Sequence, residues 1–256
     1  MSKNSSKMPN TSNLDSWFVC YKPNPEAKIR LFCFPYAGGS ANIFRSWSND
    51  LPPTVEICAI ELPGRGMRIK LPLFTQLEPL VTELASVLKP NLDKPFAFFG
   101  HSMGGLVSFE LARLLRKQYG VIPSHLFVSA RRAPQLVSNK PPIHRLPDAE
   151  FLEELRHLNG TPEALLENDE LMQLFMPIIR ADFAVLENYI YTPQTPLDCP
   201  ITAFGGLQDQ EVNHDQIKAW EEQTSAYFSL HMLPGNHFFL HSFQSFLLNI
   251  IYKKIL

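Results

Sequence analysis

The pentapeptide Gly100-His101-Ser102-Met103-Gly104 decides the fold. It follows the apolar run Phe96–Phe99, which is typical of a buried strand, and it precedes a stretch in which leucine and phenylalanine recur at helical spacing. Gly-x-Ser-x-Gly between a strand and a helix is typical of a nucleophile elbow, a sharp turn that raises the serine hydroxyl above the edge of a sheet. A side chain at either glycine would obstruct that turn. We therefore predict that Ser102 is a nucleophile.

Apolar runs typical of strands alternate with helical patterns along the rest of the chain. The expected strands are Ile29–Phe34, Val55–Ile60, Phe96–Phe99, His125–Ser129, Ile201–Phe204 and Phe228–Leu233. The expected helices lie near Ala41–Trp47, Leu77–Leu88, Gly104–Gln118, Asn213–Glu222 and Leu240–Ile251. This alternation predicts an α/β fold with a doubly wound, mostly parallel sheet.

One segment, at about residues 134–196, contains no convincing strand and is predicted to be a helical lid insertion. Its apolar residues fall on two helical faces: Phe151, Leu155 and Leu158 on one, and Leu171, Leu174, Phe175, Ile178, Ile179, Phe183 and Leu186 on the other. Most of these side chains are expected to pack on the sheet. We also hypothesise that some line a groove over Ser102 and hold an apolar acyl chain, so that Phe175→Glu would weaken binding of long-chain substrates.

A serine nucleophile needs a base within hydrogen-bond reach, and that base needs an orienting acid. His237 is predicted to be the base, because it lies in a short loop between the last strand and the terminal helix. His241, one helical turn further on, is the rival. Asp209 is predicted to be the acid, since it follows the strand Ile201–Phe204. The alternative acid position, the loop after the strand His125–Ser129, carries no carboxylate.

The tetrahedral intermediate of such a reaction needs donors for its oxyanion. One expected donor is the backbone N–H of Met103, the residue after the nucleophile. The other is expected in the glycine-containing turn Pro35–Gly39, which follows the first strand. Glycine in such a turn also has a purely conformational use, so the turn alone does not establish the role.

The composition limits the broad class of protein. The chain has 256 residues, 45% of them hydrophobic, and a formal net charge of −2, which is typical of one soluble globular domain. No basic tract indicates a nucleic-acid partner, and no apolar run is long enough to span a membrane. Residues 1–16 are predicted to be a disordered leader and residues 17–256 the folded domain. With no export signal, a cytoplasmic location and reduced thiols at Cys20, Cys33, Cys58 and Cys199 are expected.

The chain resembles the type II thioesterases that accompany nonribosomal peptide and polyketide synthetases. The matching motifs run from about Ile29 to the C-terminus: Phe34-Pro35-Tyr36-Ala37-Gly38-Gly39-Ser40, Glu61-Leu62-Pro63-Gly64-Arg65-Gly66, Gly100-His101-Ser102-Met103-Gly104-Gly105, Ser129-Ala130-Arg131, Gly205-Gly206-Leu207-Gln208-Asp209 and Gly235-Asn236-His237-Phe238-Phe239-Leu240. The resemblance implies an α/β-hydrolase fold. It also implies a triad of Ser102, Asp209 and His237, with oxyanion donors at Ala37 and Met103.

The resemblance further implies the substrate and partner: an acyl group on the phosphopantetheine arm of an acyl or peptidyl carrier protein, removed when it is aberrant or stalled. No cofactor or metal is required, and a monomer is expected. A basic rim for docking the carrier is one interpretation of Arg65, Arg68, Lys70, Arg131, Arg132, Lys140 and Arg145, and ordinary solvated surface is the other. Medium-chain hydrolases of fatty acid synthesis share the motifs. A general carboxylesterase, an acyl-transferring domain and a non-catalytic binding module are further alternatives.

Overall fold

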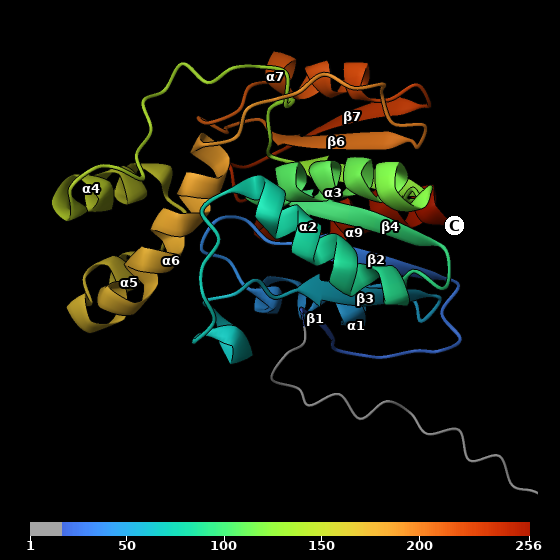
Figure 1. The fold of residues 1–256 in the computed structure, drawn as a ribbon, viewed down its shortest axis with the longest axis horizontal. Coiled ribbons are helices and arrows are strands. Elements are labelled where there is room, and N and C mark those ends of the chain that lie inside the picture. Colours follow the sequence, from blue (N-terminus) through green and yellow to red (C-terminus); the bar gives the residue numbers. More distant parts are fainter. Residues whose placement is uncertain (1–16) are drawn as a thin grey trace, which may run out of the picture.

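The protein is described here by a computed structural model, which covers residues 17–256 in detail. A seven-stranded sheet with strand order β1-β3-β2-β4-β5-β6-β7 forms its centre (Figure 1). The strands are β1 (Phe18–Cys20), β2 (Ile29–Phe34), β3 (Val55–Ile60), β4 (Phe96–His101), β5 (His125–Ser129), β6 (Ile201–Gly206) and β7 (Phe228–Leu233). The predicted leader, residues 1–16, lies outside the described residues.

Every neighbouring pair of strands is parallel except β1 with β3, which is antiparallel. The predicted α/β fold is confirmed, and the parallel strands are buried on both faces, as the continuous apolar runs indicate. Strand β7 is only half-buried because it is an edge strand. The order places β4, and the elbow that follows it, in the middle of the sheet.

Helices cover both faces of the sheet. The helices on one face are α2 (Leu77–Leu88) and α3 (Met103–Tyr119), with α7 (His214–Lys218) and the 3₁₀ helix η4 (Ala219–Gln223) beside them. On the other face lie η1 (Ala41–Phe44), α1 (Trp47–Asp50), α8 (Phe239–Ser242) and α9 (Gln244–Ile255). Two further short 3₁₀ helices are η2 (Gly66–Arg68) and η3 (Lys89–Asn91). A hydrophobic core lies on each face of the sheet, and the side chains of β2 alternate between them. Phe32 and Phe34 pack in the core beside α2 and α3, whereas Leu31 and Cys33 pack in the core beside α1 and α9.

The predicted insertion folds as three helices: α4 (Asp148–Leu158), α5 (Glu163–Leu166) and α6 (Asp169–Glu187). They lie together to one side of the sheet, at the left of Figure 1. Phe151, Leu155, Leu166, Met172 and Ile179 form a small core of their own between these helices. Because α6 also contacts α3, the insertion is anchored on the helix that begins at the elbow. Within residues 17–256, no helix combines the length and apolar character needed to cross a bilayer.

Two features of the first strand correct the sequence analysis. The short strand β1 was not expected, because three residues without a clear alternation give no strand signal. Its register sets Cys20 opposite Cys58 of β3, with the two Cα atoms 4.5 Å apart, and the structure joins them as a disulfide. The expectation of four reduced thiols is therefore wrong for this pair, since an antiparallel partner strand brought the two sulfurs together. Cys33 and Cys199 are free and buried.

Candidate active site

Ser102 lies in the strained turn that the sequence predicts. Its backbone has φ 51° and ψ −111°, a conformation that residues with a side chain rarely adopt. The Ser102 N–H donates to the carbonyl of Ser129 at 2.7 Å, which ties the turn to the neighbouring strand β5. A Cβ atom at Gly100 would meet the backbone of Gly104, and one at Gly104 would meet the carbonyl of Phe34. Both glycines are therefore required by close backbone contacts.

His237 and Asp209 form a hydrogen-bonded pair. The Nδ1–H of His237 donates to Asp209 Oδ2 at 2.8 Å, and the Asp209 side chain is fully buried. The other carboxylate oxygen accepts hydrogen bonds from the backbone N–H groups of Glu211 (2.8 Å) and Val212 (3.2 Å). These bonds hold the carboxylate, which holds the ring with Nε2 as its acceptor. The pair has the arrangement that an orienting acid and a general base require.

Ser102 and His237 line one cavity of about 680 Å³, although no hydrogen bond joins the two side chains within residues 17–256. Apolar side chains of the insertion form much of its wall: Leu155, Leu158, Ile179, Phe183 and Leu186. Phe175, the residue chosen above for a charged substitution, does not line it, and Leu174 is 61% exposed. The cavity therefore has the position and the apolar lining of the hypothesised groove, and α6 contributes Ile179, Phe183 and Leu186 from the predicted face but not Phe175.

The two expected oxyanion donors lie beside this cavity. Ala37 lines it together with Ser102, and in the described chain its N–H has no hydrogen-bond partner. Met103 is the first residue of α3, so its N–H has no partner within the helix. The next N–H of the turn, that of Gly38, donates instead to Asp182 Oδ2 at 2.7 Å. The turn thus uses the Gly38 N–H to bind Asp182, whereas the Ala37 N–H has no hydrogen-bond partner among the described residues.

A buried ion pair connects the lid to this turn. Arg65 donates to both carboxylate oxygens of Asp182 in α6, at 2.8 Å each, and to the carbonyl of Gly39 at 2.9 Å. Asp182 is 4% exposed, as is Arg65. Sequence reasoning missed Asp182, although a single acid between Ile179 and Phe183 on an apolar helix face signals a buried charge with a partner.

Two other histidines near the site, His101 and His241, have other partners. His101 is fully buried: its Nε2–H donates to the carbonyl of His237 and its Nδ1 accepts from the Ser129 hydroxyl, both at 2.9 Å. Burial, together with the neighbouring His237, holds the pKa of His101 well below its usual range, so the ring is neutral. His241, the rival base, contacts the Tyr36 hydroxyl at 3.2 Å and does not line the cavity.

The interpretation of seven basic residues as a surface rim is wrong for at least two of them. Arg65 and Arg68 are buried, with exposed fractions of 4% and 5%. Arg131, Arg132 and Lys140 line the cavity that contains Ser102 and His237, and the Lys140 side chain is also exposed. Among these three, Lys140 is paired with Glu211 at 2.7 Å.

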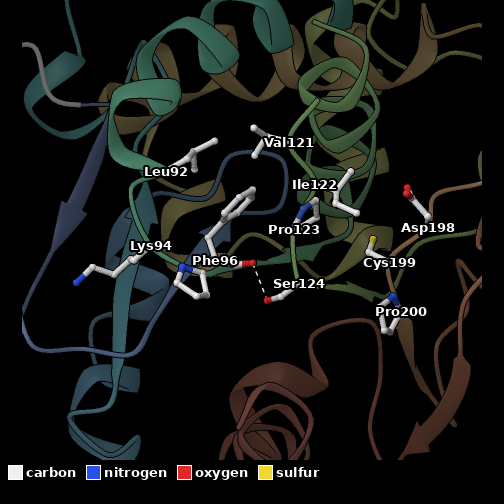
Figure 2. Close-up of a pocket in the computed structure, with 11 residues that line it drawn as sticks. Leu92, Lys94, Phe96, Val121, Ile122, Pro123, Ser124, Asp198, Cys199 and Pro200 are labelled. Atoms are coloured by element: carbon white, nitrogen blue, oxygen red, sulfur yellow. Dashed lines mark hydrogen bonds between the residues drawn. The ribbon is translucent and has the colours of Figure 1, made fainter. Parts of the chain in front are cut away.

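A second cavity, of about 360 Å³, lies at the amino-terminal ends of the parallel strands (Figure 2). Residues at the amino ends of β4, β5 and β6 line it, among them Phe96, Ser124 and Pro200. The Ser124 hydroxyl donates to the carbonyl of Phe96 at 2.8 Å, and no histidine lies in the lining. This cavity therefore lacks the base that a serine nucleophile needs. In residues 17–256, no three His, Cys, Asp or Glu side chains are grouped so as to hold a metal ion.

Comparisons with known proteins agree with this geometry. A family model described as a thioesterase domain matches residues 29–255. The chain is 51% identical over 238 residues to linear gramicidin dehydrogenase LgrE of Brevibacillus parabrevis, which covers 92% of this chain and 90% of the relative. It is 47% identical over 245 residues to gramicidin S biosynthesis protein GrsT of Aneurinibacillus migulanus, covering 95% of each. The solved structure of the type II thioesterase BorB from the borrelidin biosynthetic cluster has a TM-score of 0.87 and 35% identity, covering 97% of this chain and 100% of that one.

Proposed function

The chain belongs to the thioesterase family, and from this premise we propose that it hydrolyses acyl groups from the phosphopantetheine arm of a carrier protein, removing aberrant or stalled units during nonribosomal peptide or polyketide synthesis. It is a hydrolase of the thioesterase class. One observation supports the proposal above the others: a serine in a strained elbow shares its cavity with a histidine that is hydrogen-bonded to a buried aspartate.

In the proposed mechanism, His237 Nε2 takes the proton of the Ser102 hydroxyl as the serine oxygen attacks the thioester carbonyl. The N–H groups of Ala37 and Met103 stabilise the oxyanion. When the tetrahedral intermediate collapses, the carbon–sulfur bond breaks and His237 returns the proton to the departing thiol. His237 then activates a water molecule that attacks the acyl-enzyme, and the acid is released with Ser102 restored. Asp209 stabilises the imidazolium that forms in each half-reaction.

The cavity and the relatives support a carrier-bound acyl substrate. Its volume, about 680 Å³, lies within the range of pockets that hold small organic ligands. GrsT is named for gramicidin S biosynthesis, and BorB is named as the type II thioesterase of the borrelidin biosynthetic cluster. A fatty-acid hydrolase would use the same residues, so the identity of the acyl group and its carrier separates the two functions.

One relative is named a dehydrogenase, and the site does not favour that activity for this chain. The turn after β2 reads Pro35-Tyr36-Ala37-Gly38-Gly39-Ser40, which is not the Gly-x-Gly-x-x-Gly pattern that dinucleotide-binding turns use to approach a pyrophosphate. The free N–H of Ala37 beside Ser102 supports acyl transfer to water instead.

The test is a panel of acyl groups, each presented on a phosphopantetheinylated carrier protein, on coenzyme A and as a simple oxygen ester. We expect the highest kcat/KM with the carrier-bound thioester. Ser102→Ala is the control, and it should lower the rate by about three or more orders of magnitude, since triad residues act as a unit. A preference for the oxygen ester would reassign the function to a general esterase, and near-native turnover by Ser102→Ala would refute the nucleophile. Fluorophosphonate labelling of Ser102 separates either result from a non-catalytic binding module.

A further inference from the structure

Two arginine side chains in the cavity that contains Ser102 and His237 form no hydrogen bond or ion pair within residues 17–256. The chain has eleven arginines, and nine of them form a side-chain hydrogen bond, an ion pair or a ring contact within residues 17–256. Arg131 and Arg132 form none of these, and the Nε atom of Arg131 is buried without a hydrogen-bond partner. Both residues line the cavity that contains Ser102 and His237.

Both arginines are half-buried, and a buried guanidinium nitrogen without a hydrogen-bond partner is costly, because it has lost hydration and gained nothing in exchange. Burial and the adjacent Arg132 lower the pKa of Arg131 to about 9, which still leaves the group charged at neutral pH. Three acids line the cavity: Glu154, Glu187 and Glu211. Glu211 pairs with Lys140 at 2.7 Å, and Glu187 accepts hydrogen bonds from the His144 ring and from two backbone N–H groups. Within residues 17–256 none of the three forms an ion pair with Arg131 or Arg132, and only the charge of Glu211 acts on Arg132 from a distance.

The backbone holds Arg131 in place. The Trp220 indole N–H donates to the Arg131 carbonyl at 2.7 Å, and the preceding Ala130 has φ 49°, a strained value for a residue with a side chain. A Cβ atom at Gly105 would lie 3.3 Å from Cβ of Arg131, so this glycine leaves room for the arginine stem against α3. Strain and close packing at an unpaired charge indicate that the side chain is positioned for a ligand.

Arg131 lines the same cavity as Ser102 and His237. It comes two residues after Ser129, whose carbonyl accepts the hydrogen bond of the Ser102 N–H. A phosphopantetheine phosphate is separated from its thioester sulfur by two amide groups and would lie far from Ser102 when the thioester is bound there. A carboxylate a few carbons along the acyl chain would lie near it. Planar guanidinium groups bind carboxylates through paired, charge-assisted hydrogen bonds.

We propose that Arg131 and Arg132 form an anion subsite that binds a carboxylate carried by the acyl group, so that the enzyme accepts short dicarboxylic acyl units. This inference rests on the proposed thioesterase function and names a class of substrate for it. The apolar wall from the insertion then contacts the carbon chain, and the arginines contact its polar end.

The test compares acyl groups that differ only in this charge. Malonyl and malonamoyl, and glutaryl and glutaramoyl, are presented as N-acetylcysteamine thioesters, which contain no phosphate. We expect the wild-type protein to prefer the carboxylate over the amide in at least one pair. Arg131→Gln should reduce that kcat/KM ratio by about tenfold or more, because a charge-assisted bond is lost. Arg131→Lys should keep part of the ratio, and Arg45→Gln, an exposed arginine outside the cavity, should keep all of it.

Several outcomes would overturn the proposal. A wild-type protein without a preference for the carboxylate, or a preference that Arg131→Gln leaves intact, refutes the subsite while the hydrolysis itself supports the proposed function. If Arg131→Gln instead reduces the ratio between butyryl-phosphopantetheine and butyryl-pantetheine, the arginines bind the phosphate of the arm and the acyl assignment is wrong. If no thioester is hydrolysed, the proposed function fails. The subsite is then judged by whether glutarate raises the melting temperature more than glutaramate in the wild-type protein and not in Arg131→Gln.

Discussion

At the scale of single residues, His101 shows how the elbow also positions His237, the proposed base. It stands beside the nucleophile in sequence, yet its ring points away from the cavity and bonds to the carbonyl of His237 and the hydroxyl of Ser129. The carbonyl can only accept, so the His101 proton lies on Nε2 and the ring is fixed in one tautomer. His101 thereby connects three loops: the elbow, the end of β5 and the loop that carries His237.

Replacement of His101 by phenylalanine should lower kcat by about tenfold or more with a smaller change in KM, because the His237 loop loses its hydrogen bond and small displacements of catalytic groups are costly. His101→Gln keeps a donor for the carbonyl and should retain more activity than the phenylalanine variant. Steady-state kinetics on one thioester checks both. Equal losses in the two variants would show that His101 acts through packing alone.

At the scale of elements, charged side chains join helix α6 to the turn Pro35–Gly39, which presents the proposed oxyanion donor Ala37. Asp182 bonds to the Gly38 N–H and to the Arg65 guanidinium, which in turn bonds to the Gly39 carbonyl. The lid is therefore bonded to the loop that presents Ala37, and movement of α6 would disturb that loop. Removing one partner from such a buried pair leaves the other charge uncompensated.

Asp182→Asn should lower the free energy of unfolding by about 3 to 5 kcal/mol and should lower kcat as the turn loosens. Asp148→Asn is the matched control, because Asp148 pairs with Arg180 in the same insertion but has a side chain that is 77% exposed; its cost should be below about 1 kcal/mol. Urea unfolding and kinetics measure the two effects. If both variants lose the same stability, the buried pair has no special role.

The cavity wall offers a second test at this scale. Ile190 lines the cavity and is 85% exposed, so a charge there should not disturb the fold. Ile190→Glu should raise KM increasingly with acyl length, since each buried methylene contributes about 0.8 kcal/mol. Leu174→Glu, on an exposed face of α6 outside the cavity, is the control. The same dependence on chain length in both variants would show that the acyl group does not bind along this wall.

How far the sequence alone predicts this structure depends on the range of the contacts. The six parallel strands and the elbow at Ser102 follow from local apolar runs and glycines, so they were predictable. Two pairs join residues that are far apart in the chain: Asp182 with Arg65, and Cys20 with Cys58. No local sequence pattern predicts such partners. For the same reason Arg65 was taken for a surface residue: its burial depends on a helix that begins more than a hundred residues later.

At the scale of the whole molecule, histidines whose pKa is lowered in the folded protein link stability to pH. Burial lowers the pKa of His101, His125, His231 and His241, and the pKa of His125 falls to about 4. Unfolding restores the usual pKa of about 6.5, so below that pH the unfolded chain binds more protons and is favoured. The raised pKa of Glu61, which burial causes, acts in the opposite direction, but it is one group against four.

The protein should therefore keep its full stability above about pH 6.5 and lose it progressively toward pH 4. His125 alone should account for about 2 kcal/mol of the loss between pH 7.5 and pH 5, from a folded pKa of about 4 against about 6.5 unfolded. Urea unfolding at the two pH values measures the difference.

His125→Gln does not titrate and can still bond to Thr202, the partner of the ring at 2.8 Å, so its pH difference should be smaller by that amount. Burial between Phe127 and Thr202 favours the neutral form of the His125 ring. If the loss of stability between the two pH values is as large in His125→Gln as in the wild-type protein, other groups govern the acid sensitivity.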